Sequence, residues 1–220
     1  MAEGRAITDL FRWGSRRHED ASAPAAAAVE PEPGFPTKAF QKFLGSVAGR
    51  DAPVLLDLGP VVGANVSFFG EHLGCKIFVE DLYADLERHA RAATLDELPA
   101  LFERRLPQAA GSVDGVLAWD LFDYLDRSTA QVLASRLVRL LRPGGAILAF
   151  FGTTDARVPN YTKYVVVNEH TLQHRPYAAT RGRQRALLNR DIIRLFAGLQ
   201  VVESFLLKNN TREILFRKPI

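Results

Sequence analysis

Apolar runs and helical patterns alternate along the middle of this 220-residue chain. The runs are "VLLDLG" at 54–59, "KIFVED" at 76–81, "VDGVLAW" at 113–119 and "GAILAFFG" at 145–152, the last after the turn "RPGG". Continuous apolar runs of this length are typical of strands buried on both faces, as in the middle of a parallel sheet. The stretches between them predict helices over 64–73, 83–93, 96–105 and 127–141. The order predicts an α/β fold, a doubly wound and mostly parallel sheet built from βαβ units.

The two ends of this pattern differ from its middle. A helix over 37–48 is expected to lead into the domain, and a helix over 189–198 to follow the sheet, with Asn189 as N-cap and Gly198 as its stop. Segments 199–209 and 211–218 read as two strands joined by a tight turn, which predicts a sheet ending in an antiparallel hairpin. The β-branched and aromatic segment at about 157–180 predicts an inserted hairpin or lid.

Residues 1–35 are expected to be a flexible tail, and residues 36–220 the folded domain. The region after Arg17 is rich in Ala, Pro and Glu and cannot bury enough apolar surface to fold alone. Ile7–Arg17 carries Leu10, Phe11 and Trp13 and could form a short amphipathic helix.

Composition narrows the functional classes. Apolar residues make up 47% of the chain and charged residues 24%, which is ordinary for a globular protein. No apolar run approaches the length of a membrane span, and no secretory signal pattern opens the sequence, so we expect no membrane association. The single cysteine, Cys75, excludes an internal disulfide and a multi-cysteine metal site, and a cytoplasmic location is expected.

The first candidate site is the turn after the first core strand. Asp57 closes that strand, Gly59 allows a sharp turn, and Gly63 permits close approach of a ligand to the backbone. The helix that follows offers unpaired N–H groups to an anionic or carboxylate-bearing ligand. Glycine is also common in any tight strand-to-helix turn, so this signal needs support from elsewhere.

That support comes 17 residues after Gly63, where the second strand ends in Glu80 and Asp81. A carboxylate at this place can accept both hydroxyls of a ribose. Glu80 follows directly from the strand and is preferred, whereas counting from Gly74 favours Asp81, so the register stays open by one residue. A pair of solvated loop acids is the plainer alternative.

Together these features resemble the class I S-adenosylmethionine-dependent methyltransferase family. The resemblance rests on Asp57, Gly59 and Gly63, on the acid at Glu80, and on the order of the later elements, "VDGVLAWDLFDYL", "LLRPGGAIL" and the final hairpin, over about residues 50–220. It implies a Rossmann-like sheet of seven strands, six of them parallel, and S-adenosyl-L-methionine as cofactor. It also implies that Asp57, Gly59 and Gly63 line the methionine part, that Glu80 holds the ribose, and that Trp119 and Asp120 lie beside the amino acid portion and the transferred methyl.

The sequence departs from the family pattern at two places. Val61 stands where the family often has a further glycine, and Pro60 removes one N–H from the loop. The stretch 94–111 reads as helix and loop and supplies no third strand ending in an acid. A nicotinamide dehydrogenase shares the glycine turn and the acid, but its G-x-G-x-x-G spacing is missing and the antiparallel ending favours a methyltransferase.

Candidate catalytic residues follow the fourth strand. Asp120 is the first candidate for a base that removes a proton from the methyl acceptor, and Tyr124 the second. Asp120 could equally be the N-cap of the next helical segment. Trp119 is expected to be partly core and partly pocket wall, and Asp123 and Asp126 to be solvated.

Several other polar and aromatic residues leave both a functional and a plain interpretation open. His170 and His174 could be bases above the site, and Tyr161 and Tyr164 could stack on an aromatic acceptor or pack the inserted hairpin. The spacing supports no metal site. The amino-methylating tetrapeptide and the catalytic cysteine of cytosine-C5 enzymes have no counterpart, which disfavours those nucleic-acid base chemistries.

The sequence therefore predicts an S-adenosylmethionine-dependent methyltransferase whose acceptor it does not identify, with a small molecule as the first expectation. One alternative is a non-catalytic binding or scaffold protein of the same fold. Another is an RNA or protein methyltransferase guided by the basic final quarter, where residues 157–220 hold 12 basic and 4 acidic side chains. The basic residues gather at Arg175, Arg181, Arg183, Arg185 and Arg190, a cluster more often found on a solvated face.

Overall fold

A computed structural model describes residues 33–154, 159–184 and 186–220 of the chain. The helices are α1 (Ala39–Val47), α2 (Gly63–Leu73), α3 (Leu82–Ala92), α4 (Leu98–Arg105), α5 (Arg127–Leu140) and α6 (Asn189–Leu195). The strands are β1 (Gly34–Pro36), β2 (Val54–Asp57), β3 (Lys76–Val79), β4 (Val113–Trp119), β5 (Leu141–Gly152), β6 (Asn160–Asn168), β7 (Thr171–Ala178), β8 (Gln200–Leu206) and β9 (Thr211–Arg217). Short 3-10 turns at Leu95–Glu97 and Leu121–Tyr124 complete the described elements. The helix expected at Ile7–Arg17 lies outside the described residues.

The main sheet has the strand order β3-β2-β4-β5-β9-β8. Strands β3, β2, β4 and β5 are parallel, and β9 runs antiparallel to both β5 and β8. This confirms a mostly parallel α/β sheet that ends in an antiparallel hairpin. The seven strands implied by the family resemblance are a wrong expectation for the described residues, which form six in this sheet. The stretch between β3 and β4 is occupied by α3, α4 and a loop, and no strand pairs with the outer edge of β3 there.

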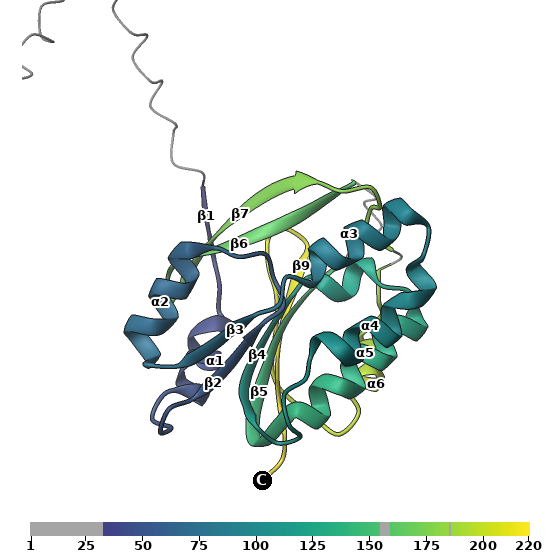
Figure 1. The fold of residues 1–220 in the computed structure, drawn as a ribbon. Coiled ribbons are helices and arrows are strands. Elements are labelled where there is room, and N and C mark those ends of the chain that lie inside the picture. The colour runs from purple at the N-terminus through teal and green to yellow at the C-terminus, as the bar shows by residue number, and fades with distance from the viewer. Residues whose placement is uncertain (1–32, 155–158, 185) are drawn as a thin grey trace, which may run out of the picture. The chain divides into compact units, whose positions relative to one another are not determined.

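Helices cover both faces of the sheet (Figure 1). Because side chains alternate along a strand, neighbours in β2 serve different cores: Leu55 packs with α1 and α2, and Leu56 packs with α3, α4, α5 and α6. Both leucines are fully buried. A strand buried on both faces therefore explains the unbroken apolar run from which it was predicted.

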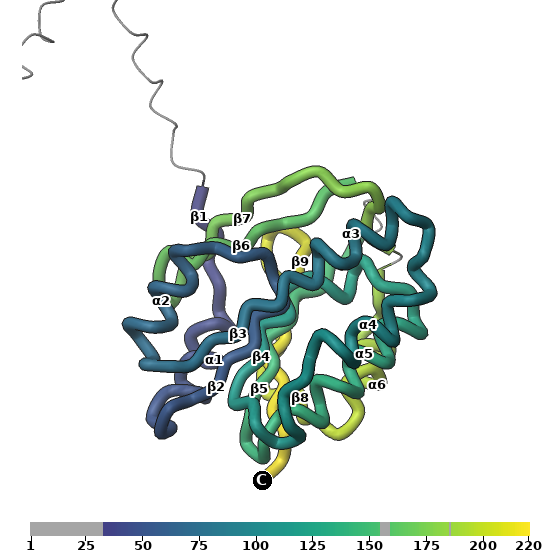
Figure 2. Tube along the Cα trace, in the orientation of Figure 1, coloured from purple at the N-terminus to yellow at the C-terminus, as the bar shows by residue number. Residues whose placement is uncertain are grey.

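A second, three-stranded sheet with the order β1-β7-β6 contains the hairpin of the inserted segment. The hairpin passes over the end of the main sheet near the start of α3 (Figure 2). Its strand β6 contacts α2. The hairpin thus lies above the edge at which the parallel strands β2, β3 and β4 finish.

Two predicted boundaries are corrected by the structure. Strand β5 begins at Leu141, ahead of the turn expected at "RPGG", because Leu141 already pairs with Val113 of β4. The side chain of Asn189 does not cap α6; its Oδ1 accepts a hydrogen bond of 2.6 Å from Arg212. Gly198 follows the end of the helix in the left-handed conformation, with φ of 93°.

Candidate functional site

Asp57 lies at the carboxyl end of β2, inside the turn that leads into α2. Its Oδ1 accepts hydrogen bonds from the backbone N–H of Gly59 at 2.9 Å and from the indole Nε1 of Trp119 at 2.6 Å. The side chain is buried, and this burial raises the pKa of Asp57 to about 6 in spite of the two hydrogen bonds. The carboxyl group therefore changes its charge close to neutral pH.

Trp119, the last residue of β4, covers the turn from above. A Cβ atom placed on Gly59 would come within 2.8 Å of the Trp119 ring, so only glycine fits under the indole. The ring is 2% exposed and stacks on Tyr164 of the hairpin, with centroids 5.1 Å apart and an angle of 4°. Its backbone has a φ of 48°, which is strained for a bulky residue.

Gly63, the first residue of α2, lies in open space, and a Cβ there would meet nothing within 4 Å. Val61, which replaces the glycine common in the family, is 65% exposed. The turn is therefore open on its Gly63 side and closed on its Gly59 side by Trp119. The Trp119 ring is thus part of the core, and its expected second role as a pocket wall stays a prediction.

Glu80 and Asp81 follow β3 and lie at the same edge as Asp57. The backbone N–H of Glu80 donates to the carbonyl of Asp57 at 2.8 Å. The Glu80 side chain is paired with Arg105 at 3.4 Å and accepts a hydrogen bond of 3.3 Å from Gln108. Asp81 instead caps α3 through the N–H of Ala84, in a left-handed conformation. Because the carboxylate of Asp81 already accepts the N–H of Ala84 as the cap of α3, Glu80 is the stronger candidate of the two for binding a ligand hydroxyl.

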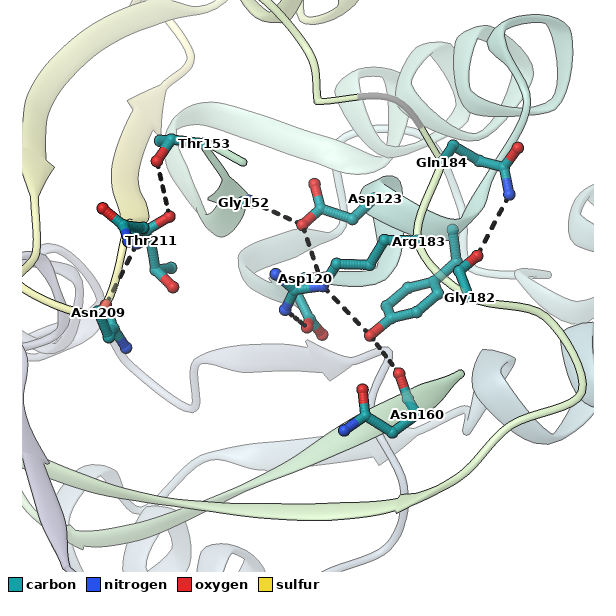
Figure 3. A network of polar contacts seen from close by, with 12 residues as sticks. Asp120, Asp123, Gly152, Thr153, Asn160, Gly182, Arg183, Gln184, Asn209 and Thr211 are labelled. Atoms are coloured by element: carbon teal, nitrogen blue, oxygen red, sulfur yellow. Dashed lines mark hydrogen bonds and ion pairs between the residues drawn. The ribbon is translucent and has the colours of Figure 1, made fainter. Parts of the chain in front are cut away.

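Asp120 begins the turn after β4 and is completely buried. Its Oδ1 accepts a hydrogen bond of 2.6 Å from the Tyr83 hydroxyl. Its Oδ2 pairs with Arg183 at 2.7 Å (Figure 3). The N-cap alternative is wrong, because no backbone N–H bonds this side chain in the turn Leu121–Tyr124. Asp120 is held by a tyrosine of α3 and an arginine from the loop after the hairpin.

Asp123 joins the same network and is not solvated, contrary to expectation. It accepts a hydrogen bond of 2.7 Å from the N–H of Gly152 and lies 3.7 Å from Arg183 (Figure 3). Burial raises the pKa of Asp123 to about 7, although the nearby Arg183 acts in the opposite direction. Burial works against the charge of Arg183, but Asp120 and Asp123 outweigh it and raise the pKa of that guanidinium above its ordinary value.

Tyr124, the second catalytic candidate, is part of this network too. Its hydroxyl donates to the carbonyl of Asn160 at 2.8 Å and lies 3.4 Å from the Nε of Arg183. Burial raises the pKa of Tyr124 well above its ordinary value. It is therefore a proton donor or an orienting group at neutral pH, and not a base. Asp126 is the N-cap of α5, where it accepts from the N–H of Thr129 at 3.0 Å.

All five tyrosines of the chain converge on this region. The rings of Tyr83, Tyr124 and Tyr161 lie 4.9 to 6.1 Å apart, and Tyr177 packs on Tyr161. Sequence order gives no hint of the convergence, because these residues come from α3, the turn after β4, and the hairpin. The result is a packed cluster of tyrosine rings beside the buried Asp120, which accepts the hydrogen bond of the Tyr83 hydroxyl.

The two histidines of the hairpin take different places. His174 stacks on Phe35 with centroids 4.3 Å apart, and burial lowers its pKa to about 4, so the ring is neutral. His170 is exposed at the hairpin turn. His174 thus packs the hairpin, and the charge of Asp120 acts on its ring.

The hairpin and the loop behind it are tied to the sheet at several points. Asn65 of α2 donates to the carbonyl of Tyr164 and accepts from the N–H of Val166, both at 2.8 Å. Glu87 of α3 accepts hydrogen bonds from the hydroxyl of Tyr161 and from Thr180. These polar ties hold the hairpin over the ends of the strands.

The basic residues that are close together in the final quarter of the sequence have different surroundings in the structure. Arg183 is an internal partner of Asp120 and not part of a solvated face. Arg181 donates to Gln184 at 2.8 Å, and Arg185 lies outside the described residues. The involvement of Arg183 could not be seen in the sequence, where it was one of several basic residues in a polar segment.

In the described part of the chain, no group of three or more acidic, histidine or cysteine side chains gathers to hold a metal ion. Among those same residues, no helix combines the length and the apolar character that crossing a bilayer requires.

Comparison with known proteins gives a likeness at the level of structure. No protein-family model and no curated protein matches the sequence. A putative methyltransferase from Haloferax volcanii, solved in complex with the Trm112 methyltransferase activator, aligns with a TM-score of 0.50 and 16% identity over 82% of this chain and 88% of that one. The 1,6-didemethyltoxoflavin-N1-methyltransferase of Burkholderia thailandensis was solved with S-adenosylhomocysteine. It aligns with a TM-score of 0.49 and 19% identity over 83% of this chain and 79% of that one.

The order of strands, the antiparallel hairpin and the Haloferax likeness define the architecture. The chain has the fold of class I methyltransferases, without the strand that would extend the sheet beyond β3 in the described residues. At this level of identity the likeness concerns the fold, and the chemistry has to be argued from the site.

Proposed function

We propose that this chain is an S-adenosylmethionine-dependent methyltransferase acting on an acceptor not yet identified, with a small molecule as the first candidate and the cytoplasm as its place of action. The observation that carries the proposal is the meeting of Asp57, Glu80 and Trp119 at the carboxyl ends of three adjacent parallel strands. Open α/β sheets bind their ligands at this edge. Two of the residues there, Asp81 and Trp119, have strained backbones, which is common at ligand sites.

In this proposal each residue of the edge has a defined part. Glu80 accepts the ribose hydroxyls, and Asp57 with the Gly59–Gly63 turn holds the methionine end. S-adenosylmethionine supplies an activated methyl group when it is bound. Asp120 takes the proton from the acceptor, Tyr124 orients it, and the cluster of tyrosine rings keeps water away from both.

The residues fit this cofactor at one end and need a rearrangement at the other. The Gly63 side of the turn is open, whereas Trp119 lies against Gly59 and uses the Oδ1 of Asp57. We therefore propose that the indole turns away from Gly59 when the cofactor binds. The backbone of Trp119, with φ of 48°, is strained in the way that is common at ligand sites.

The test is a calorimetric titration with S-adenosylmethionine and S-adenosylhomocysteine, followed by transfer of a labelled methyl group to fractions of a cell extract. Asp57→Asn and Glu80→Gln keep the size of each side chain, and each is expected to weaken binding about tenfold or more, as for a lost hydrogen bond to a charged group. Glu71→Gln on the exposed face of α2 is the matched control and should bind like the wild type. No binding by the wild type would refute the proposal.

A second candidate is a non-catalytic binding protein of the same fold. The specific observation in its favour is that Trp119 already fills the space above Gly59, while both carboxylate oxygens of Asp120 are engaged. Cofactor binding without transfer to any fraction would support this candidate. Methylation of RNA receives less support, because Arg183 is turned inward from the basic cluster.

A further inference from the structure

A pocket of about 520 Å³ lies between the start of α5 and helix α6, outside the site described above. The two helices contact one another and run together on one side of the sheet (Figure 1). Asp57, Asp120 and Arg183 do not line this pocket. Its volume is in the range of small-molecule sites, about 300–1,000 Å³.

The lining of the pocket has an apolar and a basic part. Leu187 and Leu188 supply accessible apolar surface, and the buried Phe122, Leu125 and Leu195 belong to the same lining. Three arginines, Arg127, Arg190 and Arg194, belong to the same lining and are exposed. An apolar lining with a small number of placed polar groups is typical of a small-molecule site.

Arg127, Arg190 and Arg194 differ from the other arginines of the described chain in their contacts. Most arginines of the described chain donate to a carboxylate or a carbonyl, as Arg50, Arg136 and Arg139 do. Within the described residues no hydrogen bond or ion pair engages the guanidinium groups of the three pocket arginines. Arg190 and Arg194 lie four residues apart on α6, so two like charges share one face and repel. An anion between them would relieve this repulsion.

Two carboxylates also line the pocket, and they differ in availability. Asp126 is engaged as the N-cap of α5, with hydrogen bonds from Ser128 and Thr129, which hold its pKa at about 2 although burial acts in the opposite direction. Asp191 is the remaining acid, in the first turn of α6. The three arginines therefore leave a positive balance at the rim.

We propose that this pocket binds an organic anion with an apolar body, of the class of medium-chain or aryl carboxylates. The apolar body would lie on Leu187 and Leu188, and the carboxylate would pair with Arg190 and Arg194. The proposal does not depend on methyl transfer, because it uses none of the residues at the strand ends. It assigns part of the basic final quarter to a ligand.

The test is calorimetric titration of the full chain with decanoate, and with decanol as the neutral probe of the same length. Decanoate should bind the wild type saturably and the Arg190→Ala/Arg194→Ala variant about tenfold more weakly or worse, the effect expected for lost charge-assisted hydrogen bonds. Arg104→Ala, an exposed arginine of α4, is the matched control and should bind like the wild type. Asp191→Asn should bind decanoate more tightly than the wild type does. Decanol should bind the wild type no more tightly than decanoate binds the double variant.

Equal decanoate affinity of the double variant and the wild type would overturn the proposal, as would the absence of saturable binding to the wild type. Unchanged thermal midpoints of the variants would show that they are folded. Because Asp57→Asn should leave decanoate binding intact, failure of this proposal and failure of the cofactor proposal can be told apart.

Discussion

Asp120 and Arg183 form an ion pair in which the carboxylate side chain is 1% exposed and the guanidinium 24%. Burying two charges is costly, and their attraction repays this cost only when the remaining hydrogen bonds are made. Here Tyr83 supplies the second hydrogen bond to Asp120, and Asp123 lies on the other side of Arg183. The pair is therefore well satisfied but would be vulnerable to loss of either member.

Removal of Arg183 should therefore destabilise the protein. Arg183→Ala leaves two buried carboxylates without their cation, and we expect a loss of about 3 kcal/mol in the free energy of unfolding. The double variant Asp120→Asn/Arg183→Gln should recover much of that loss. Urea denaturation measures both, with Arg104→Ala as control. A loss below about 0.5 kcal/mol for Arg183→Ala, the range of ordinary surface changes, would contradict the ion-pair account.

Asp123 should make stability depend on pH. Its pKa is raised to about 7 in the folded chain, so the folded state holds the proton more tightly than the unfolded state does. The contribution of Asp123 is fully present below about pH 4 and is lost as the pH rises to about 7, at about 1.4 kcal/mol per unit of pKa shift.

The variant Asp123→Asn keeps an acceptor for the N–H of Gly152 and removes the titration. Its unfolding midpoint in urea should depend less on pH between 4 and 8 than that of the wild type, and should be higher at pH 8. Equal slopes of the two proteins would show that Asp123 does not titrate in this range. Asp57, with a pKa of about 6, should contribute in the same direction.

At the residue scale, the sequence could identify the site residues that follow directly after strands. It could not identify those that a distant loop or helix brings to the site. Asp57, Glu80 and Asp120 could be recognised because each follows an apolar run directly. Arg183 and Tyr83 could not, since their importance depends on which loop and which helix face reach Asp120. The solvated role expected for Asp123 was wrong because the turn Leu121–Tyr124 folds inward, and all its residues are buried.

Among the elements, the inserted hairpin β6–β7 depends on a few polar ties. Asn65 is buried on α2 and forms one hydrogen bond in each direction with the hairpin backbone. Its side-chain amide thus bonds the backbone groups of Tyr164 and Val166 as a neighbouring strand would. The chain can hold the hairpin above the sheet without extending either sheet to meet the other.

Asn65→Ala should loosen the hairpin. Two buried backbone groups lose their partner, and each unsatisfied group costs about 1–3 kcal/mol. Hydrogen exchange should accelerate at the amides of β6 more than at those of β4. Ser67→Ala, at an exposed position of the same helix, should leave both unchanged. Uniform acceleration over all strands would indicate global unfolding and not a local tie.

Elements with a strong periodic pattern were predictable from sequence. The limits of β4 and α5 agree with their predicted spans, because alternation of buried runs and amphipathic helices determines both. The start of β5 was not predictable, since pairing with β4 extends the strand through a glycine and proline turn sequence. The pattern of 94–111 already indicated that no strand lies beyond β3. The family resemblance by itself implied seven strands, one more than the described residues form in this sheet.

For the whole molecule, the proposed cofactor site depends on the position of the Trp119 ring. The fold places a glycine turn and an acid at one edge of the sheet, and the indole of Trp119 lies between the turn and the hairpin. A ligand at the methionine end of the proposed site has to move this ring. The chain has only two tryptophans, so the movement can be observed directly.

The most direct measurement is the fluorescence of Trp119 in the Trp13→Phe variant during titration with S-adenosylhomocysteine. If the ligand displaces the indole from Gly59, the emission should shift and saturate, and Glu80→Gln in the same background should require more ligand for the same shift. Glu71→Gln should behave like the parent. An emission spectrum that stays constant while calorimetry also detects no binding would contradict the account, because the space above Gly59 would then belong to Trp119 permanently.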